Sequence, residues 1–503
     1  MFRKINVQQI SLGFLIAVAG FTTSCKKNSS QPEAEAGAVV ESNNLQTTTT
    51  NRDYLTKDSI FLYAKQTYFW NVGMPSYDTF NPRKYASNDA ELAGLKALAS
   101  TGGKDKYSFI DDGSVASQLS GVSGDYGFSA NFDASNLLRV KFVYPNSPAD
   151  LKGLKRGYLI TRVNGGGVSR SSQTDIDNLN NGIFGSNPTI TMTVAKPDVT
   201  SQDLVITRGS YTINPVLFTK TYTVGAKKIG YIVFNSFTTN AAAFLDAAFA
   251  KFASDGVTEL VVDLRYNGGG SVATSELFTN LIAPPAQNGK VMYTTYWTKT
   301  MQDEKATILS NQKFYAKGND NITRLYSLFD YSYKPTMAAG NQEIFAKRGS
   351  LNGLTRVYFL VASGTASASE LLINNLKPVM DVKLIGRKTY GKPVGFFSIR
   401  IDKNDLYIPQ FQTKNQLDQG DYFDGMAVDK DIADDLTKDF GDTSEAMLAQ
   451  ALYYSANSNF TSYLKDNSLS STSGSSRVLI DNANEKLDHE FKGMIETRKL
   501  KMK

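Results

Sequence analysis

The chain has 503 residues with a net charge of +6, and 41% of its residues are hydrophobic and 20% charged. This composition argues against wholesale disorder, and the length predicts roughly two to four domains. Lysine and arginine residues do not gather among aromatic ones, which argues against a nucleic-acid groove. The one cysteine and one histidine exclude an intramolecular disulfide and leave no ligand set for a structural zinc. We therefore expect no nucleic-acid partner, no metal and no cofactor.

Residues 1–24 have the pattern of an export signal. Two basic residues precede an apolar run, 10–21, that is too short to predict a membrane span. Small and hydroxyl residues then lead into Cys25, and this junction resembles the lipobox of bacterial lipoproteins, in which the cysteine is diacylated. The resemblance implies a protein of the cell envelope, tethered to a membrane by a lipid on Cys25, on the periplasmic or outer-membrane side. An ordinary signal peptide with an incidental cysteine is the alternative.

The remaining chain divides by composition and periodicity. A stretch rich in Ser, Thr and Asn has no apolar periodicity and predicts a flexible tether, whereas apolar residues at helical spacing follow it and predict a small helical cap. The domains we expect are the signal peptide 1–24, the tether 25–52, the helical cap 53–115, a β domain 120–210, an α/β core 215–455, and a polar linker and tail 456–503.

Strand-like runs alternate with glycine turns between residues 120 and 210. A short helix is expected inside this region, capped by Ser147 with Pro148 at its first position. The order of motifs resembles a PDZ domain, which implies a small β-barrel that binds an extended peptide as an added strand. In that resemblance the carboxylate-binding loop falls on Tyr126, Gly127, Phe128 and Ser129. A β-barrel that folds around its glycine turns and binds no ligand is the alternative.

Apolar strands alternate with helices from residue 228 onward. A helix over 240–253 lies between two apolar strand patterns, which predicts a βαβ unit and a parallel sheet. The strands expected in this core are 229–234, 259–265, 356–362 and 382–386, with further helices over 367–376 and 443–455. A long aromatic and polar segment, 293–352, predicts a helical insertion. After the Ser-rich run 468–476, we expect disorder or a frayed helix.

The candidate chemistry is a serine with a lysine as its base. Ser367 follows an apolar strand and begins a helix, so the amide of Ala368 is placed to stabilise a developing oxyanion. A lysine removes a serine proton only when burial lowers its pKa by several units. Lys392 has Tyr390, Val394 and Phe396 beside it to form such an apolar pocket. The one histidine, His489, lies in a polar stretch near the C-terminus, which leaves a Ser-His-Asp relay almost without a base.

A glycine-rich turn, Gly268-Gly269-Gly270, follows the strand that ends at Arg265 and can present amides to a ligand. It lacks the Lys-Ser/Thr ending of a phosphate loop. Arg265 either anchors a substrate carboxylate or pairs with a nearby acid. Glu370 and Asp263 are expected to orient or cap the site rather than to transfer protons.

Together these motifs resemble the C-terminal processing, or tail-specific, serine peptidases. The resemblance covers residues 53–455 in matching order and includes "DLRYNGGG", "GTASASE" and "GRKTYGKPVG". It implies a ClpP/crotonase-like core, Ser367 as the nucleophile and Lys392 as the general base. The oxyanion hole would then be formed by the amide of Ala368 and that of Gly269 or Gly270. Many relatives have Gln where this chain has Phe396, or Asp where it has Pro378, so a Ser–Lys dyad is the expectation.

The sequence therefore predicts a multidomain α/β and β protein that acts as a lipid-anchored serine endopeptidase with an acyl-enzyme intermediate. Its expected partners are polypeptides with exposed C-terminal tails, and no oligomeric state is predicted. Two other classes stay open: a non-catalytic peptide-binding lipoprotein, and a Ser–Lys hydrolase of a non-peptide envelope substrate.

Overall fold

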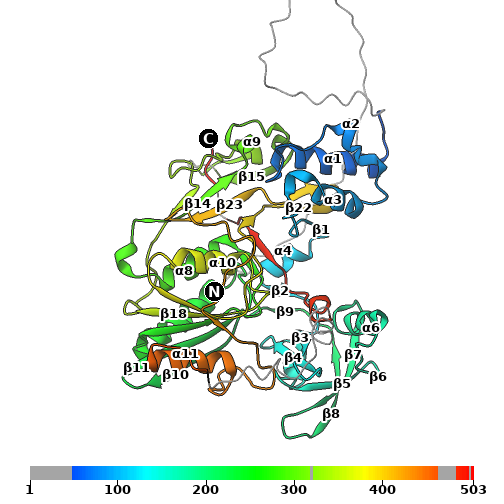
Figure 1. Ribbon diagram of the computed structural model, residues 1–503. Helices are drawn as coiled ribbons and strands as arrows, with labels where there is room; N and C mark the ends of the chain where they lie inside the picture. The colour runs from blue at the N-terminus through cyan, green and yellow to red at the C-terminus, as the bar shows by residue number, and fades with distance from the viewer. Residues whose placement is uncertain (1–47, 318–320, 463–482, 498–499) are drawn as a thin grey trace, which may run out of the picture. The chain divides into compact units, whose positions relative to one another are not determined.

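A six-stranded sheet forms the core of the α/β region (Figure 1). The structure is a computed structural model that describes residues 48–317, 321–462, 483–497 and 500–503. The strands of this sheet lie in the order β10-β11-β12-β18-β19-β24, and all neighbours are parallel except β10 and β11. The strands are β10 (Val216–Val224), β11 (Lys227–Phe234), β12 (Glu259–Asp263), β18 (Arg356–Val361), β19 (Asp381–Gly386) and β24 (Lys430–Asp431).

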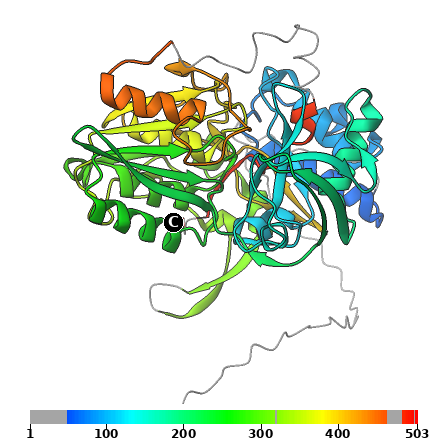
Figure 2. The same cartoon turned by 90° about the horizontal axis from the view of Figure 1, so that it is seen from below.

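Helices cover both faces of this sheet. Alternate residues of β11 point to opposite sides, so Ile232 and Phe234 pack in one apolar cluster and Tyr231 and Val233 in another. The first cluster includes α7 (Ala242–Asp255), α8 (Val272–Ile282) and α10 (Ala368–Leu376), and the second includes α11 (Ala446–Asn457). Figure 2 shows α11, in orange, and the green helix α7 on opposite sides of the strands. The predicted βαβ unit, β11-α7-β12, is confirmed.

The predicted N-terminal helices are also present. They are α1 (Arg52–Thr67) and α3 (Asn88–Lys96), and their buried side chains belong to the same cluster as the core helices. A short strand, β1 (Phe109–Asp111), then pairs with β22 (Asn404–Tyr407). The cap therefore shares its apolar core with the α/β region instead of folding around one of its own.

A second sheet contains β3, β4, β5, β7 and β8 in that order, with β6 paired to β5. These strands are β3 (Phe128–Phe132), β4 (Leu138–Val143), β5 (Leu159–Val163), β6 (Gly166–Gly167), β7 (Thr189–Ala195) and β8 (Ser201–Thr207). The predicted short helix is α5 (Pro148–Leu151), capped by Ser147, and α6 (Gln173–Phe184) follows. No strand pairing within the described residues joins β3 to β8, so the sheet is open and the closed barrel that we predicted is not found.

The prediction of a helical insertion over 293–352 is wrong. The segment supplies β14 (Val291–Trp297) and β17 (Gln342–Ile344) to a separate sheet, together with a hairpin of β15 (Lys313–Lys317) and β16 (Thr323–Ser327). Its helical parts are short, such as α9 (Lys299–Gln302). β14 is rich in β-branched and aromatic residues and pairs with β23 (Phe411–Asn415), more than a hundred residues away, which decides its conformation.

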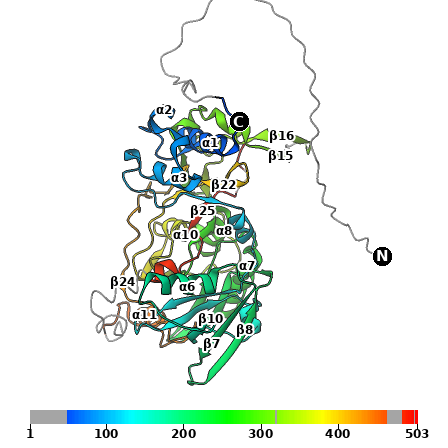
Figure 3. The same cartoon turned by 90° about the vertical axis from the view of Figure 1, so that its right-hand side faces the viewer.

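The chain after the described gap at 463–482 is also more ordered than predicted. Ala483 and Leu487 are fully buried in the apolar cluster of the second sheet. β25 (Gly493–Ile495) then pairs in parallel with β13 (Gly269–Ser271). Figure 3 shows β25 beside α8 and α10. These few apolar residues form no periodic pattern, so their partners can be found only in the tertiary structure.

The signal peptide, Cys25, most of the tether and the Ser-rich run lie outside the described residues. Of the helices that the structure describes, none combines the length and the apolar character that crossing a membrane requires.

Candidate active site

Ser367 lies at a sharp turn between β18 and α10. Its backbone has φ 63° and ψ −111°, a conformation that costs a non-glycine residue free energy and is concentrated at functional sites. The side chain is fully buried, and its Oγ has no hydrogen-bond partner among the described residues. A buried hydroxyl that satisfies no local hydrogen bond is rare, and it is chemically available to a partner that enters the site.

The glycine-rich turn is fixed against this serine turn by hydrogen bonds. The amide of Ala366 donates to the carbonyl oxygen of Asn267 at 3.2 Å, and the hydroxyl of Ser369 donates to the same oxygen at 3.0 Å. The Thr365 hydroxyl donates to the carbonyl of Leu264 at 2.7 Å. Two motifs about a hundred residues apart in the sequence thus form one rigid unit.

One buried carboxylate holds the segments of Ser367 and Lys392 together. Oε2 of Glu370 accepts from the backbone amides of both residues, each at 2.8 Å. Oε1 accepts from the Thr389 hydroxyl at 2.6 Å and from the amide of Gly391 at 2.8 Å. Burial raises the pKa of Glu370, whereas these four donors favour its ionised form. The prediction that Glu370 orients the site agrees with these contacts.

Lys392 is fully buried just before β20 (Val394–Gly395). Its Nζ lies 4.0 Å from the ring centre of Phe396 and 5.4 Å from that of Tyr107. Burial lowers the pKa of Lys392 to about 7, against the opposing charges of Asp105 and Glu370. The apolar pocket that the sequence requires is therefore present, and Phe396 is part of it.

Two of the groups around Lys392 had no signal in the sequence. Tyr107 and Asp105 come from the N-terminal cap, and the Tyr107 hydroxyl donates to the carbonyl of Gly391 at 2.5 Å. The Nζ of Lys392 donates to the carbonyl of Lys492 at 2.8 Å, which brings the C-terminal segment into the site.

The candidate oxyanion donors surround the same place. Gly269 and Gly270 have φ of 110° and 136°, values that favour glycine. A Cβ on Gly269 would lie 2.4 Å from the carbonyl oxygen of Gly493 and 2.9 Å from the amide nitrogen of Ala368, so no side chain fits there. The amide of Gly269 already donates to Oδ1 of Asn267 at 2.9 Å. This leaves the amide of Ala368 as a candidate, together with that of Gly270, which lies in the pairing of β13 with β25.

Arg265 has a structural role, because its guanidinium forms ion pairs with carboxylates of the protein itself. Its guanidinium is buried and binds Asp263 at 2.8 Å, Asp434 at 2.6 Å and Glu445 at 2.8 Å. Burial by itself would lower the pKa of Arg265, but these carboxylates raise it well above the usual value. Of the two roles considered for Arg265, pairing with nearby acids is the one observed.

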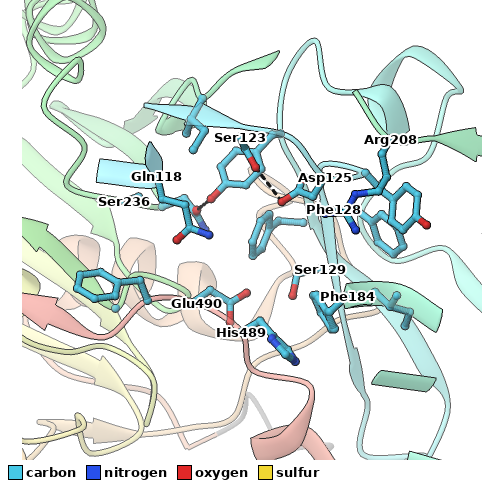
Figure 4. A pocket seen from close by; sticks show the side chains of 18 residues that line it. Gln118, Ser123, Asp125, Phe128, Ser129, Phe184, Arg208, Ser236, His489 and Glu490 are labelled. Atoms are coloured by element: carbon cyan, nitrogen blue, oxygen red, sulfur yellow. Dashed lines mark hydrogen bonds between the residues drawn. The ribbon is translucent and has the colours of Figure 1, made fainter. Parts of the chain in front are cut away.

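Tyr126, Phe128 and Ser129 line a cavity of about 250 Å³ beside the second sheet (Figure 4). Arg208 and Phe184 contribute to the same wall, and His489 and Glu490 close it from the C-terminal segment. The backbone of Gly127 is engaged inside the turn, since its amide donates to Asp125 at 2.7 Å. The cavity extends to Gly268 and so connects this region with the glycine-rich turn.

We predict that Glu370→Gln lowers the free energy of unfolding by about 2–4 kcal/mol, because an amide group cannot accept all four hydrogen bonds and leaves buried donors unsatisfied. Urea denaturation measures the change. Glu485→Gln, at an exposed position, is the matched control and should stay within about 0.5 kcal/mol of wild type. A Glu370→Gln protein as stable as wild type would contradict the organising role of this carboxylate.

Comparisons with known proteins place the core of the chain among peptidases. Residues 228–434 match peptidase family S41. The chain is 26% identical over 329 residues to the chloroplastic C-terminal processing peptidase of Tetradesmus obliquus, covering 62% of this chain and 61% of that protein. It is 25% identical over 339 residues to a CtpA-like serine protease of Staphylococcus aureus, covering 67% and 58%. The match thus spans about three fifths of the length of these relatives.

A solved structure has the same fold. It is a Bacteroides fragilis protein assigned as an S41 protease, with a TM-score of 0.56 and 24% identity over 82% of this chain and 100% of that one. The family match contains the glycine-rich turn, Ser367, Glu370 and Lys392. Residues 228–434, which contain the candidate site, therefore match peptidase family S41, and the similar proteins found by sequence are named as a C-terminal processing peptidase and a CtpA-like serine protease.

Proposed function

We propose that this protein is a serine endopeptidase in which Ser367 is the nucleophile and Lys392 the general base. The observation that carries the proposal is the carboxylate of Glu370, which binds the backbone amides of both residues at 2.8 Å. The burial of Lys392 supports it, because a pKa of about 7 makes the neutral amine available near neutral pH.

In the proposed mechanism, the neutral amine of Lys392 takes the proton of the Ser367 hydroxyl as Oγ bonds to the substrate carbonyl carbon. The amides of Ala368 and Gly270 stabilise the oxyanion that forms. The tetrahedral intermediate collapses, the C–N bond breaks, and Lys392 gives its proton to the leaving amine. A water molecule, deprotonated by Lys392, then attacks the acyl carbon, the bond to Ser367 Oγ breaks, and Lys392 returns the proton to Oγ as the product with a new C-terminal carboxylate leaves.

We also propose that the region of β3 to β8 recognises substrates by exposed C-terminal tails, as a PDZ domain does. Tyr126, Gly127, Phe128 and Ser129 would bind the end of the tail. The cavity beside them supports this proposal, since it leads to Gly268 and Ser129 Oγ has no hydrogen-bond partner within the described residues. The name of the T. obliquus relative, a C-terminal processing peptidase, is in line with such substrates.

We predict that Ser367→Ala and Lys392→Ala each lower kcat/KM by about 1,000-fold or more, because each removes one half of a unit that acts together. The substrate is an unfolded protein with an apolar C-terminal residue, followed by mass spectrometry, and the same protein with a charged end tests tail recognition. Ser363→Ala and Lys388→Ala, both at exposed positions, are the matched controls and should cleave normally. Tail binding without cleavage by wild type would favour a non-catalytic peptide-binding protein.

The pH dependence should report the titration of Lys392. Because the neutral amine is the active form, kcat/KM should rise about tenfold per pH unit below a midpoint near 7 and level off above it. The negative charge of Asp105 raises the pKa of Lys392, so Asp105→Asn should move the midpoint to lower pH. Asp112→Asn, at an exposed position of the same cap, should leave it unchanged. A midpoint that is the same in all three proteins would contradict this assignment of the base.

The proposed location is the cell envelope, with a diacylated Cys25 as the anchor. The junction at Cys25 supports this proposal, since the chain has no other cysteine. We predict that wild type partitions into the detergent phase on Triton X-114 separation and that Cys25→Ser partitions into the aqueous phase. Equal partition of the two proteins would contradict the lipid anchor.

A further inference from the structure

The segment 483–497 occupies the position of an added strand at the candidate active site. β25 pairs in parallel with β13, and the amide of Gly493 donates to the carbonyl of Gly268 at 3.0 Å. On its other side, the amide of Phe396 donates to the carbonyl of Met494 at 3.0 Å, and Glu496 donates back to Phe396 at 2.9 Å. Backbone hydrogen bonds of this kind bind an extended polypeptide largely independently of its sequence.

Carbonyl groups of this segment lie at both parts of the proposed catalytic machinery. The carbonyl of Lys492 accepts from the Nζ of Lys392 at 2.8 Å. The carbonyl oxygen of Gly493 and the amide nitrogen of Ala368 lie 2.4 Å and 2.9 Å from the point where a Cβ of Gly269 would lie, so the two atoms are close together. A substrate whose carbonyl oxygen accepts from the amide of Ala368 would therefore overlap with Gly493.

Lys392 and Ser367 are not joined by the hydrogen bond that proton transfer between them requires. The Oγ of Ser367 has no hydrogen-bond partner within the described residues, while the amine of Lys392 is directed at the carbonyl of Lys492. A general base must lie within hydrogen-bond reach of the proton that it removes. The segment therefore provides the observed hydrogen-bond partner of Lys392 Nζ and also occupies the strand position.

The same segment is fastened to the second sheet upstream of β25. The side-chain amide of Asn484 donates to the carbonyl of Phe132 at 3.0 Å and accepts from its amide at 2.7 Å, as a neighbouring strand would. Glu490 binds the buried Lys141 at 2.9 Å, and the ring of His489 stacks on Phe184 with 4.2 Å between centres. Figure 4 shows His489 and Glu490 on the wall opposite Ser123 and Asp125.

We infer that residues 483–497 act as an inhibitor built into the chain, which holds the peptide-binding region and the catalytic site at once and must leave before a substrate binds. This inference rests on the proposed function. A tethered segment has an effective concentration of about millimolar, so it competes strongly with substrates from solution even when its own contacts are modest. The segment occupies both regions continuously, which makes its binding and that of a tail-recognised polypeptide mutually exclusive.

Two variants test the inference at different points of the segment. Glu490→Lys places two positive charges together at Lys141, and Gly493→Pro removes the hydrogen bond to Gly268. We expect each to raise kcat/KM for an unfolded protein substrate at least about tenfold. We expect a synthetic peptide of residues 483–497, added in solution, to inhibit the variants again. Glu485→Lys, at an exposed position of the same segment, is the matched control and should behave as wild type.

Labelling of Ser367 by a fluorophosphonate separates the two hypotheses, because it reports access to the nucleophile without any peptide substrate. Faster labelling and cleavage by the two variants than by wild type would support the inference. Equal labelling and equal cleavage in all proteins would overturn the inference and leave the proposed function intact. Cutting of wild type within 491–497, seen as a mass loss, would also overturn it, since the segment would then be a substrate. No labelling and no cleavage in any protein would overturn both.

Discussion

The site depends on one buried carboxylate. Glu370 lies in the first turn of α10, where its own helix positions it beside Ser367, and it accepts from the amides of Ser367, Gly391 and Lys392. Charge-assisted hydrogen bonds in a dry environment are strong and directional, so they fix the backbone of two separate loops relative to each other. The strained backbone of Ser367 persists because this carboxylate and the glycine-rich turn hold it from both sides.

Arg265 and Lys392 are both buried basic residues, but their surroundings differ. Arg265 is surrounded by the carboxylates of Asp263, Asp434 and Glu445, so it stays charged and joins β12 to the start of α11. Lys392 has two aromatic rings and a carbonyl near its amine, and no carboxylate of the described residues forms a salt bridge with it. Its burial therefore lowers its pKa. Burial is therefore compensated by ion pairs at Arg265, whereas at Lys392 it lowers the pKa and makes the residue a candidate base.

The C-terminal segment uses the binding features that suit a peptidase for substrates of varied sequence. Backbone hydrogen bonds to Gly268 and Phe396 require only an extended chain, while Asn484 and Glu490 add specific contacts to the second sheet. In the inhibition that we infer, residues 483–497 occupy this position until a polypeptide that binds more tightly displaces them.

Local sequence patterns were enough to predict the βαβ unit at β11 to β12, α10 after Ser367, the cap of Ser147 on α5, and the candidate pair Ser367 and Lys392 in their motifs. Which groups come into contact could be seen only in the folded structure. It placed Tyr107 and Asp105 at Lys392, turned the expected helical insertion into β14 and its neighbours, and brought β25 to β13 from more than two hundred residues away. This difference arises because hydrophobic periodicity and capping act within a few residues, whereas strand pairing and desolvation depend on partners that the chain contacts only after it has folded.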